Sequence, residues 1–463
     1  MSVAIVGGGL TGLASAVFLV ESGVSPSDIV IFEKDQRLGG KVETAFFGDR
    51  PVDLGPDAFL TRTKDATGFA DLIGIGDRLI RPSAFSASIY AKDRLHKVPS
   101  GIMLGVPVNF QEFFASASMI SLKGKLRAAA DFIIPKTRLG DDYTVSELVG
   151  SRFGREVEEM LVEPMLGGIN AGSTKDLGIE AVAPMINSAY KKSSARSLTK
   201  NLVSIAPKPS KANTPQIPFG SFENGLSELI DASIKFIEGA TIYQGKEIAA
   251  ITTNSLGVRI ETTDGDSYNF DQAIVASPSF VAHQLLQNIP KDAKEGLKSI
   301  DFASVGVVLL RYPKDAIQAT IAGSGVLVPK SNNFLMTATT YASRKWSHIS
   351  SETSEIFKVS VGRFRDTRFM EMGDEEVIEK VSAEIGKILR INTSPDTTFM
   401  RRWDRALPQF RPYHREMVTS IRNSIEATER VAIAGASYDG VGIPSCIASA
   451  KNAVQRSLSW VGN

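Results

Sequence analysis

The first twelve residues, MSVAIVGGGLTG, contain the stretch that decides the fold. Residues 3–6 are short and wholly apolar, which predicts a buried strand, and the glycine-rich residues 7–12 follow at once. Apolar residues then recur at helical spacing from Leu13 to Val20. The order strand, glycine turn, helix is typical of the dinucleotide-binding unit of a doubly wound α/β fold.

The glycines of this turn have separate physical roles. Gly7 permits the tight turn, Gly9 lets the backbone approach a pyrophosphate, and Gly12 lets the helix pack closely on the strand. The unpaired N–H groups of the helix N-terminus can bind the anion. A tight turn without a ligand is the alternative interpretation. The predicted cofactor contacts in this segment are Gly7, Gly8, Gly9, Leu10, Thr11 and Gly12.

A second predicted strand, residues 29–32, ends at Glu33, whose carboxylate can accept hydrogen bonds from ribose hydroxyls. The segment RLGGK, residues 37–41, comes soon after. Its two adjacent glycines bring the backbone close again, beside the cations Arg37 and Lys41, which can face phosphate. A simple surface turn would look similar.

The C-terminal region indicates which reactive ring is bound. Residues 431–435 predict a strand, residues 438–444 a loop, and residues 445–458 a helix. The positive end of that helix would stabilise a reduced, anionic isoalloxazine ring, a use that nicotinamide does not share. The chain shows no second strand-GxGxxG-helix unit for NAD(P)H. We therefore predict one flavin and an oxidase that passes electrons to oxygen or another diffusible acceptor.

Composition excludes several classes of protein. The 463 residues are 43% hydrophobic, which is enough for sizeable cores and argues against disorder. With 52 Lys+Arg against 51 Asp+Glu the net charge is +1, so no nucleic-acid partner is expected. Four dispersed histidines and the single Cys446 suggest neither a metal site nor a disulfide, and the compartment is predicted to be reducing. We also find no signal peptide and no spanning segment, which favours the cytoplasm.

The predicted cofactor domain is discontinuous. Strand-like pieces with turns between them recur at residues 241–276, separated from the N-terminal unit by a mostly helical insertion and from the C-terminal strand by an alternating one. We predict a Rossmann-like cofactor domain, an α+β substrate domain and a helical domain. Their boundaries are 1–63, 218–296 and 400–463 for the first, 64–90, 185–217 and 297–399 for the second, and 91–184 for the third.

Two cationic segments lie within the insertions. No acid occurs from residue 181 to 222, where basic residues stand among Ser and Pro. A solvated loop is the simpler interpretation, and a surface that steers a polycarboxylate or anionic lipid is the other. Residues 123–134 combine three cations with an apolar run, which suits a core-facing helix or contact with a membrane surface. The basic residues of the first segment are Lys191, Lys192, Arg196, Lys200, Lys208 and Lys211.

From end to end the chain resembles the flavin-dependent porphyrinogen oxidases, most closely their bacterial coproporphyrinogen III oxidase branch. The resemblance is carried by residues 7–12, Glu33, residues 37–41, VDLGPDAF at 52–59, EPMLGGINAG at 163–172 and GVGIPSCI at 440–447. The glycine units are shared with amine oxidases at large, and the resemblance therefore implies an amine-oxidase-like fold. The segment 163–172 is much narrower and points to the subfamily.

The resemblance implies FAD as the cofactor. Gly55 and Pro56 would bring rigid backbone to the ring, Ile248 in a strand over residues 245–250 would give a backbone pair to the adenine, and Trp403 would form an apolar wall. A core tryptophan is an equal interpretation of Trp403. Beyond the first turn, the implied contacts are Glu33, Lys34, Arg37, Gly39, Gly40, Lys41, Gly55, Pro56, Asp57, Ala58, Ile248, Trp403, Val441, Gly442 and Ile443.

The chemistry implied by the resemblance is hydride removal from a methylene bridge of a tetrapyrrole in three two-electron steps, with oxygen reduced to peroxide. This demands little acid–base apparatus, so we assign no catalytic side chain and no metal. Gly168 would orient the macrocycle through its carbonyl, and Leu327 would clamp it, with Thr339 and Val361 in the same wall. Core packing explains Leu327 and Val361 nearly as well.

The sequence departs from the family pattern where protoporphyrinogen oxidases place a propionate-binding arginine, because residues 85–90 contain no cation. We expect Arg62, Lys64 and the basic residues 191–211 to hold the carboxylates instead. Asn170 and Gly167 also depart from the usual residues beside Gly168, which changes the pocket.

Local positive charge favours the tetracarboxylate coproporphyrinogen III over the dicarboxylate protoporphyrinogen IX. We therefore expect a coproporphyrinogen III oxidase of haem biosynthesis. The alternatives are a protoporphyrinogen IX oxidase, a flavin amine oxidase and a flavin-binding scaffold without turnover. Peripheral membrane contact and association with other haem-pathway enzymes stay open.

Overall fold

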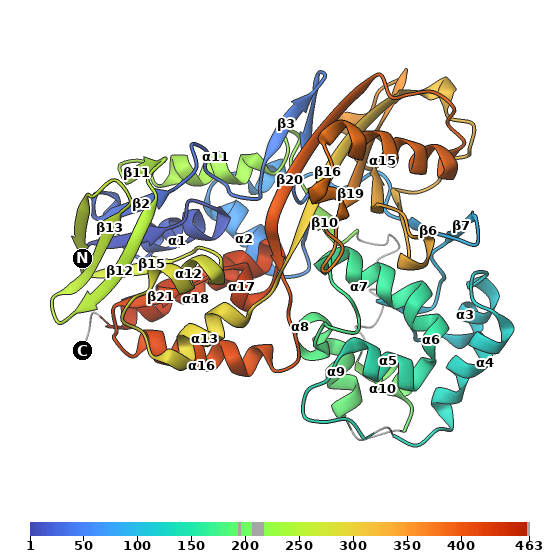
Figure 1. The fold of residues 1–463 in the computed structure, drawn as a ribbon, viewed down its shortest axis with the longest axis horizontal. Coiled ribbons are helices and arrows are strands. Elements are labelled where there is room, and N and C mark those ends of the chain that lie inside the picture. The colour runs from blue at the N-terminus through green and yellow to red at the C-terminus, as the bar shows by residue number, and fades with distance from the viewer. Residues whose placement is uncertain (137, 193–195, 206–216, 461–463) are drawn as a thin grey trace. The chain divides into compact units, whose positions relative to one another are not determined.

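The computed structural model describes residues 1–136, 138–192, 196–205 and 217–460 (Figure 1). They form two compact units, each assembled from separated parts of the chain. Unit 1 comprises residues 1–81, 218–301 and 415–463, and unit 2 comprises residues 82–217 and 302–414. Lys208 and Lys211 lie outside the described residues.

Unit 1 contains a five-stranded parallel sheet. Its strand order is β11 (Thr241–Gln244), β2 (Ile29–Glu33), β1 (Val3–Val6), β15 (Gln272–Val275) and β21 (Val431–Ile433). All four residues of β1 are buried, as a central parallel strand requires.

Each face of this sheet has its own apolar core, because successive side chains of a strand alternate between faces. Val3 and Ile5 pack with helices α1 (Leu10–Glu21), α2 (Lys64–Leu72), α11 (Ser227–Phe236) and α18 (Ile443–Ser459). Ala4 and Val6 pack with helices α12 (Ser279–Leu285), α13 (Lys291–Ser299) and α16 (His414–Glu426). The second face also packs on the small antiparallel sheet β12 (Ile248–Asn254), β13 (Gly257–Thr262) and β14 (Ser267–Phe270).

Unit 2 contains a seven-stranded sheet. The order is β20 (Thr397–Pro408), β16 (Phe302–Pro313), β19 (Ser354–Val361), β18 (Met336–Tyr341), β17 (Gly325–Leu327), β6 (Ala87–Ala91) and β7 (Arg94–Lys97). Helix α15 (Asp374–Leu389) packs on one face.

A helical cluster forms a second core in unit 2, around Phe113, Leu148, Phe153 and Leu166. It includes α3 (Phe110–Ser116), α4 (Leu122–Ala129), α5 (Val145–Phe153), α7 (Glu163–Asn170), α9 (Pro184–Lys191) and α10 (Leu198–Ile205). Helix α5 begins with a capping box, in which Thr144 and Glu147 each accept a hydrogen bond from the other's backbone N–H. In the described part of the chain no helix is both long and apolar enough to cross a membrane.

The predicted domain boundaries differ from these units in three places, of which the shortest is residues 297–301, predicted in the substrate domain but part of unit 1. Residues 64–81 belong to unit 1, where Phe69 of α2 contacts Phe18 of α1 at 5.6 Å between ring centroids. Residues 400–414 belong to unit 2, because β20 pairs with β16 along its whole length. An apolar or alternating pattern predicts that an element exists, but it does not say which neighbour the element joins.

Two local predictions are also corrected. Residues 436–439 form the short helix α17 (Ala436–Asp439), so the predicted loop begins only at Gly440. The predicted strand over residues 245–250 begins only at Ile248, because Gly245 adopts a left-handed conformation with φ +68°.

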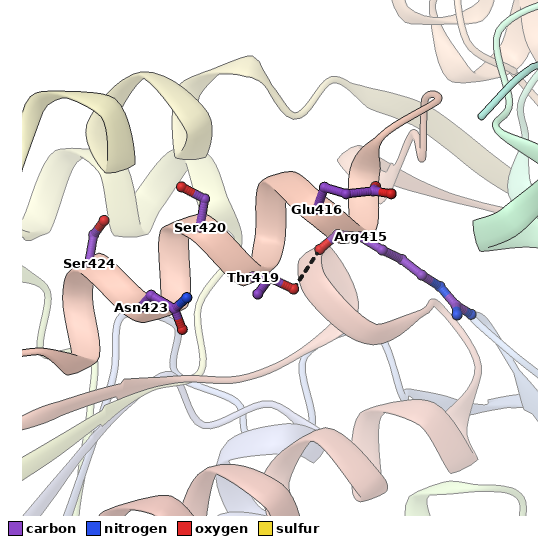
Figure 2. A pocket seen from close by; sticks show the side chains of 6 residues that line it. All are labelled: Arg415, Glu416, Thr419, Ser420, Asn423 and Ser424. Carbon is purple, nitrogen blue, oxygen red and sulfur yellow. Dashed lines mark hydrogen bonds between the residues drawn. The ribbon is translucent and has the colours of Figure 1, made fainter. Parts of the chain in front are cut away.

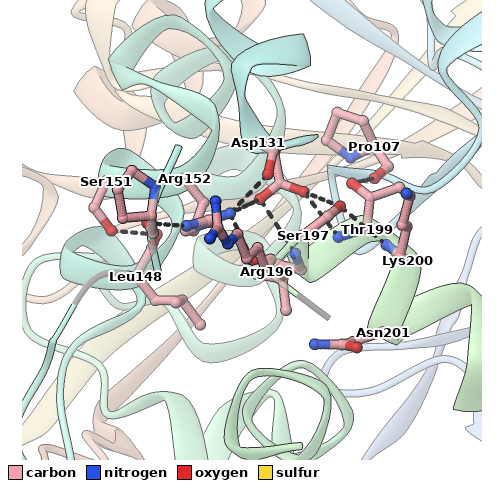
Figure 3. Close-up of polar contacts among 12 residues, drawn as sticks. Pro107, Asp131, Leu148, Ser151, Arg152, Arg196, Ser197, Thr199, Lys200 and Asn201 are labelled. Carbon is pink, nitrogen blue, oxygen red and sulfur yellow. Dashed lines mark hydrogen bonds and ion pairs between the residues drawn. The ribbon is translucent and has the colours of Figure 1, made fainter. Parts of the chain in front are cut away.

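A buried ion pair connects the helices of unit 2 (Figure 3). Arg152 on α5 and Asp131 are 1% and 0% exposed, and their closest nitrogen and oxygen lie 2.7 Å apart. Asp131 also accepts hydrogen bonds from the Ser197 hydroxyl and from the Leu198 and Thr199 amides, where α10 begins. The remaining nitrogens of Arg152 donate to backbone carbonyls, including that of Arg196. The pair is therefore fully satisfied and fixes the start of α10.

Replacing Arg152 with Met should lower the free energy of unfolding by about 3–5 kcal/mol, because Asp131 would keep a buried, unpaired charge. The matched control is Arg155→Met, which removes an exposed i,i+4 pair with Glu159 and should leave the free energy of unfolding nearly unchanged. Urea unfolding followed by circular dichroism measures both. Equal losses in the two variants would contradict this account of the network.

Candidate functional site

The glycine turn of unit 1 leaves no room for side chains at its closest contacts. Gly7 has φ +112°, and its N–H donates to the Phe32 carbonyl at 2.8 Å. A Cβ on Gly12 would lie 1.9 Å from the Gly7 carbonyl oxygen, so only glycine lets α1 approach β1 this closely. A Cβ on Gly9 would meet nothing nearer than 3.8 Å, which leaves space beside the turn.

Two helices begin at this turn region without side-chain caps. The N-cap of α1 is Gly9 and the N-cap of α18 is Gly442, and neither helix start receives a side-chain hydrogen bond. Helices α1 and α18 pack against each other, and the first-turn residues Thr11 and Cys446 interact. The first N–H groups of an uncapped helix, together with the helix dipole, suit an anionic ligand. Predicted contacts Leu10, Thr11, Val441, Gly442 and Ile443 all lie at these two helix starts.

A second glycine pair lies against the turn. Gly39 forms a parallel bridge with Gly9, and its N–H donates to the Gly8 carbonyl at 2.9 Å. A Cβ on Gly40 would lie 3.3 Å from the Gly9 Cα. At Gly39 and Gly40 the segment 37–41 therefore approaches the turn through its backbone, as the adjacent glycines predicted, and the Leu38 side chain lies against Gly8.

The two cations of that segment differ from each other. The Arg37 guanidinium donates to the Leu38, Gly40 and Val42 carbonyls and pairs with Glu43 at 3.4 Å. It thus braces its own loop, and its contact with phosphate remains a prediction. Burial lowers the pKa of Lys41, and no such set of carbonyls surrounds its ammonium group among the described residues.

Glu33 fixes the glycine turn from the end of β2. Its Oε2 accepts from the Gly8 N–H at 2.7 Å and its Oε1 from the Asp35 N–H at 2.9 Å, and the side chain is buried. Lys34, which follows it, is exposed. The Lys246 N–H donates to the Glu33 carbonyl at 2.9 Å, so the segment that leads into Ile248 begins at this end of the sheet. The contact of Glu33 with ribose and that of Ile248 with adenine remain predictions.

Residues 55–58 lie beside the same loop. A Cβ on Gly55 would be 1.9 Å from the Lys41 carbonyl oxygen, so these two backbones touch. Pro56 is exposed, and Asp57 and Ala58 are partly exposed. The sequence reasoning missed Asp53, which holds the segment in place by accepting hydrogen bonds from the Leu226 N–H at 2.9 Å and the Thr44 hydroxyl.

Cys446 lies in the first turn of α18. Burial raises the pKa of its thiol to about 11, against smaller opposing effects of Thr11 and Lys41. The thiol is therefore protonated at neutral pH, and its Sγ lies 3.7 Å from the Gly440 carbonyl oxygen. Its surroundings favour packing over nucleophilic chemistry.

In unit 2 the structure brings Gly168 and Leu327 together. Gly168 is exposed on α7, and a Cβ there would lie 3.7 Å from Leu327 Cδ2 on β17. Asn170 is buried and donates to the Leu166 carbonyl of its own helix at 2.9 Å. A Cβ on Gly167 would lie 3.0 Å from the Gly172 carbonyl oxygen. The two departures from the family pattern therefore have local structural roles.

The structure separates Thr339 and Val361 from Leu327, which corrects the prediction of one shared wall. Thr339 lies opposite Val326 and Val359, both in the core beneath α15, and Val361 belongs to the same core. Leu327 instead packs on the helical core. Directly paired residues share a face of a sheet, so these two side chains lie on the face opposite to Leu327.

Register identifies the residues that share the face of Leu327. Leu327 pairs with Ala338, and Ala338 pairs with Ser360. One pleat further on, Thr340 pairs with the buried Lys358. The same alternation assigns Arg401 and Trp403 to this face through their partners Val307 and Val305 on β16. A period-two count along residues 354–361 could have found Ser360, whereas the bulge between Met336 and Ala338 hides Ala338 and Thr340 from such a count.

We call this surface, made up of residues 327, 338, 340, 358, 360, 401 and 403, the Leu327 face. The Arg401 guanidinium lies 4.5 Å from the centre of the Trp403 ring, in cation–π geometry. Trp403, predicted to wall the flavin, therefore shares a face with the predicted substrate clamp. Its contact with flavin remains a prediction.

The predicted carboxylate anchors are divided between the two units. Arg62 and Lys64 are exposed at the start of α2 in unit 1. In unit 2, Lys191 pairs with Glu180 at 3.0 Å, and Lys192 donates to Ser204 at 3.2 Å. Their part in substrate binding remains untested.

A surface depression lies elsewhere on unit 1, along α16 (Figure 2). Its lining is polar and comes from a single helix, and none of it was predicted to bind a ligand. The lining residues are Arg415, Glu416, Thr419, Ser420, Asn423 and Ser424.

Comparison with known proteins identifies the class to which this fold and site belong. Residues 10–458 match the family model described as flavin containing amine oxidoreductase, and the chain belongs to that family. This confirms the predicted amine-oxidase-like fold and a flavin as the cofactor.

Two curated relatives are named coproporphyrinogen III oxidase. The one from Bacillus subtilis is 30% identical over 99% of this chain and 98% of its own length. The one from Staphylococcus aureus is 29% identical over 99% of both chains. A solved structure from Exiguobacterium sp. 255-15 has a TM-score of 0.87 at 26% identity, covering 100% of this chain and 99% of that one. The resemblance to the porphyrinogen oxidases is thus confirmed.

Replacing Gly12 with Ala should weaken flavin binding by roughly 30- to 150-fold, the equivalent of about 2–3 kcal/mol of overpacking. The new methyl group would displace the Gly7 carbonyl and with it the turn. Titration of FAD into the flavin-free protein, followed by flavin fluorescence, measures the affinity.

The matched control is Gly68→Ala in α2, where a Cβ meets nothing within 4 Å. This variant should bind flavin as the unchanged protein does and gain roughly 0.5–1 kcal/mol of stability from helix propensity. Unchanged flavin affinity in Gly12→Ala would contradict the assigned role of the turn.

Proposed function

We propose that this chain is an FAD-dependent oxidase that converts coproporphyrinogen III to coproporphyrin III in haem biosynthesis, with O2 as acceptor and H2O2 as by-product. The observation that carries the proposal is the position of Gly168 beside Leu327, where a Cβ on Gly168 would lie 3.7 Å from Leu327 Cδ2, because it brings the family-specific segment 163–172 next to the Leu327 face. The full-length similarity to relatives of that name supports it.

FAD, rather than FMN, suits unit 1. A glycine turn at an uncapped helix N-terminus recognises a pyrophosphate, which FAD contains and FMN lacks. We propose that unit 1 binds FAD and that unit 2 binds the tetrapyrrole. When bound, the flavin supplies two-electron acceptance and reoxidation by oxygen.

The side chains of unit 2 bind and orient the substrate. The exposed Gly168 carries no side chain that would keep a macrocycle from its backbone, so its carbonyl can accept from pyrrole N–H groups. Leu327, Ala338 and Thr340 offer a half-buried surface for the flat ring, which excludes water there. We assign no side chain as acid or base.

We also propose a cytoplasmic location with contact to a membrane surface. Leu122, Leu126 and Ile133 are 69%, 58% and 77% exposed, and Lys123 lies among them in sequence. Such an apolar and cationic surface suits anionic lipid. Co-sedimentation with phosphatidylglycerol vesicles, but not with phosphatidylcholine vesicles, would support this contact. If the Leu126→Asp variant sediments with phosphatidylglycerol vesicles as strongly as the unchanged protein does, the proposed contact is wrong. Other haem-pathway enzymes remain candidate partners.

The proposed reaction predicts that anaerobic addition of coproporphyrinogen III bleaches the flavin absorbance and that air restores it with formation of porphyrin and peroxide. Porphyrin fluorescence should show a higher kcat/KM for coproporphyrinogen III than for protoporphyrinogen IX, because the former has more carboxylates to pair.

Faster turnover of protoporphyrinogen IX would overturn the substrate preference but leave the reaction type standing. Bleaching by primary amines and by no porphyrinogen would identify a flavin amine oxidase. Protein that binds flavin but reacts with neither class would indicate a scaffold.

A further inference from the structure

Arg363 lies in a tight turn that directly follows β19. Its carbonyl accepts from the Asp366 N–H at 2.9 Å, and its own N–H donates to the Asp366 carbonyl at 3.3 Å. Between them, the Phe364 N–H donates to the Ala171 carbonyl at 2.6 Å, at the end of α7. The turn is therefore fixed to the same helix that presents Gly168.

Other cations around this turn have acidic partners. Lys330 pairs with Glu163 at 2.8 Å, Arg365 with Asp176 at 3.1 Å, and Arg368 with Asp366 at 2.8 Å. The guanidinium of Arg363 makes no hydrogen bond or ion pair with the described residues, and its Nε is buried. Arg363 is thus the exception within this group.

The nearby carboxylates are already occupied. Oε1 of Glu163 pairs with Lys330, and Oε2 accepts from the Thr174 N–H at 2.7 Å. Although burial opposes it, the ion pair with Lys330 holds the pKa of Glu163 below its usual range. Both carboxylate oxygens of Asp366 accept from Arg368, at 2.8 and 2.9 Å. Neither acid forms a hydrogen bond or an ion pair with Arg363, although their charges act on it from a distance.

A largely desolvated guanidinium without an anion is costly, and a site that binds an anionic ligand accounts for that cost. Burial lowers the pKa of Arg363, and the charges of Asp366 and Glu163 offset that effect only in part. Its planar fork suits two parallel hydrogen bonds to a carboxylate.

We propose that Arg363 binds a propionate carboxylate of the tetrapyrrole and is a specificity-determining residue for coproporphyrinogen III. The inference rests on the proposed function and adds to it a residue that distinguishes substrates by binding one of their carboxylates.

The test compares two porphyrins on the full-length, flavin-loaded protein. Coproporphyrin III carries four carboxylates, and its tetramethyl ester carries none. R363Q should weaken binding of the acid about tenfold and leave binding of the ester unchanged, as measured by fluorescence quenching. The matched control is R365Q, because Arg365 lies two residues away, is 65% exposed and is paired with Asp176. It should change binding of the acid less than twofold.

Acid binding by R363Q equal to that of the unchanged protein would overturn the inference, and so would an equal loss for acid and ester, which would indicate packing. If R363Q does not load flavin, R363K decides: it keeps the charge but cannot make two parallel bonds, and should lose about threefold on the acid alone. If R363K instead binds the acid as tightly as the unchanged protein does, or loses affinity for the acid and the ester equally, the inference is overturned. Failure of the unchanged protein to bind or oxidise any porphyrin would instead overturn the proposed function.

Discussion

The space between Gly12 and the Gly7 carbonyl is the constraint on which the cofactor unit depends. A single added carbon would lie 1.9 Å from that oxygen, so α1 can approach β1 only because residue 12 has no side chain. This approach places the start of α1 next to the start of α18 and leaves both without side-chain caps. Gly39, Gly40 and Gly55 likewise bring backbone against backbone, so peptide groups make several of the closest contacts in this region. Peptide N–H groups are what a pyrophosphate requires.

Short-range patterns in the sequence predicted much of unit 1 correctly. The strand at Val3–Val6, the glycine turn and the second strand ending at Glu33 all form as expected, because each depends on neighbouring residues. The closing strand at Val431–Ile433 was also predicted, since an apolar run flanked by glycine is a local signal. The hydrogen-bond partners of Arg37 were not predicted, because they are carbonyls of a loop whose shape the sequence does not reveal.

The face of a strand in unit 2 could not be predicted without its register. Leu327 and Thr339 lie on consecutive strands, β17 and β18, and the sequence does not show which faces they occupy. Because Thr339 pairs with Val326, its side chain belongs to the core beneath α15, on the face opposite to Leu327. A bulge between Met336 and Ala338 shifts the alternation along β18, so counting residues alone gives the wrong face beyond it. Trp403 shares the Leu327 face only through a long pairing of β20 with β16. Arginine side chains show the same dependence: Arg152 is fully paired and the Arg363 guanidinium is not, although each directly precedes a phenylalanine in the sequence.

Amide hydrogen exchange with and without added FAD tests the central claim most directly, because the claim concerns backbone N–H groups. The account predicts that FAD slows exchange in two separate segments, residues 7–12 and residues 440–446, since both helix starts would bind the cofactor. Protection confined to one of these segments, or located elsewhere in the chain, would contradict it.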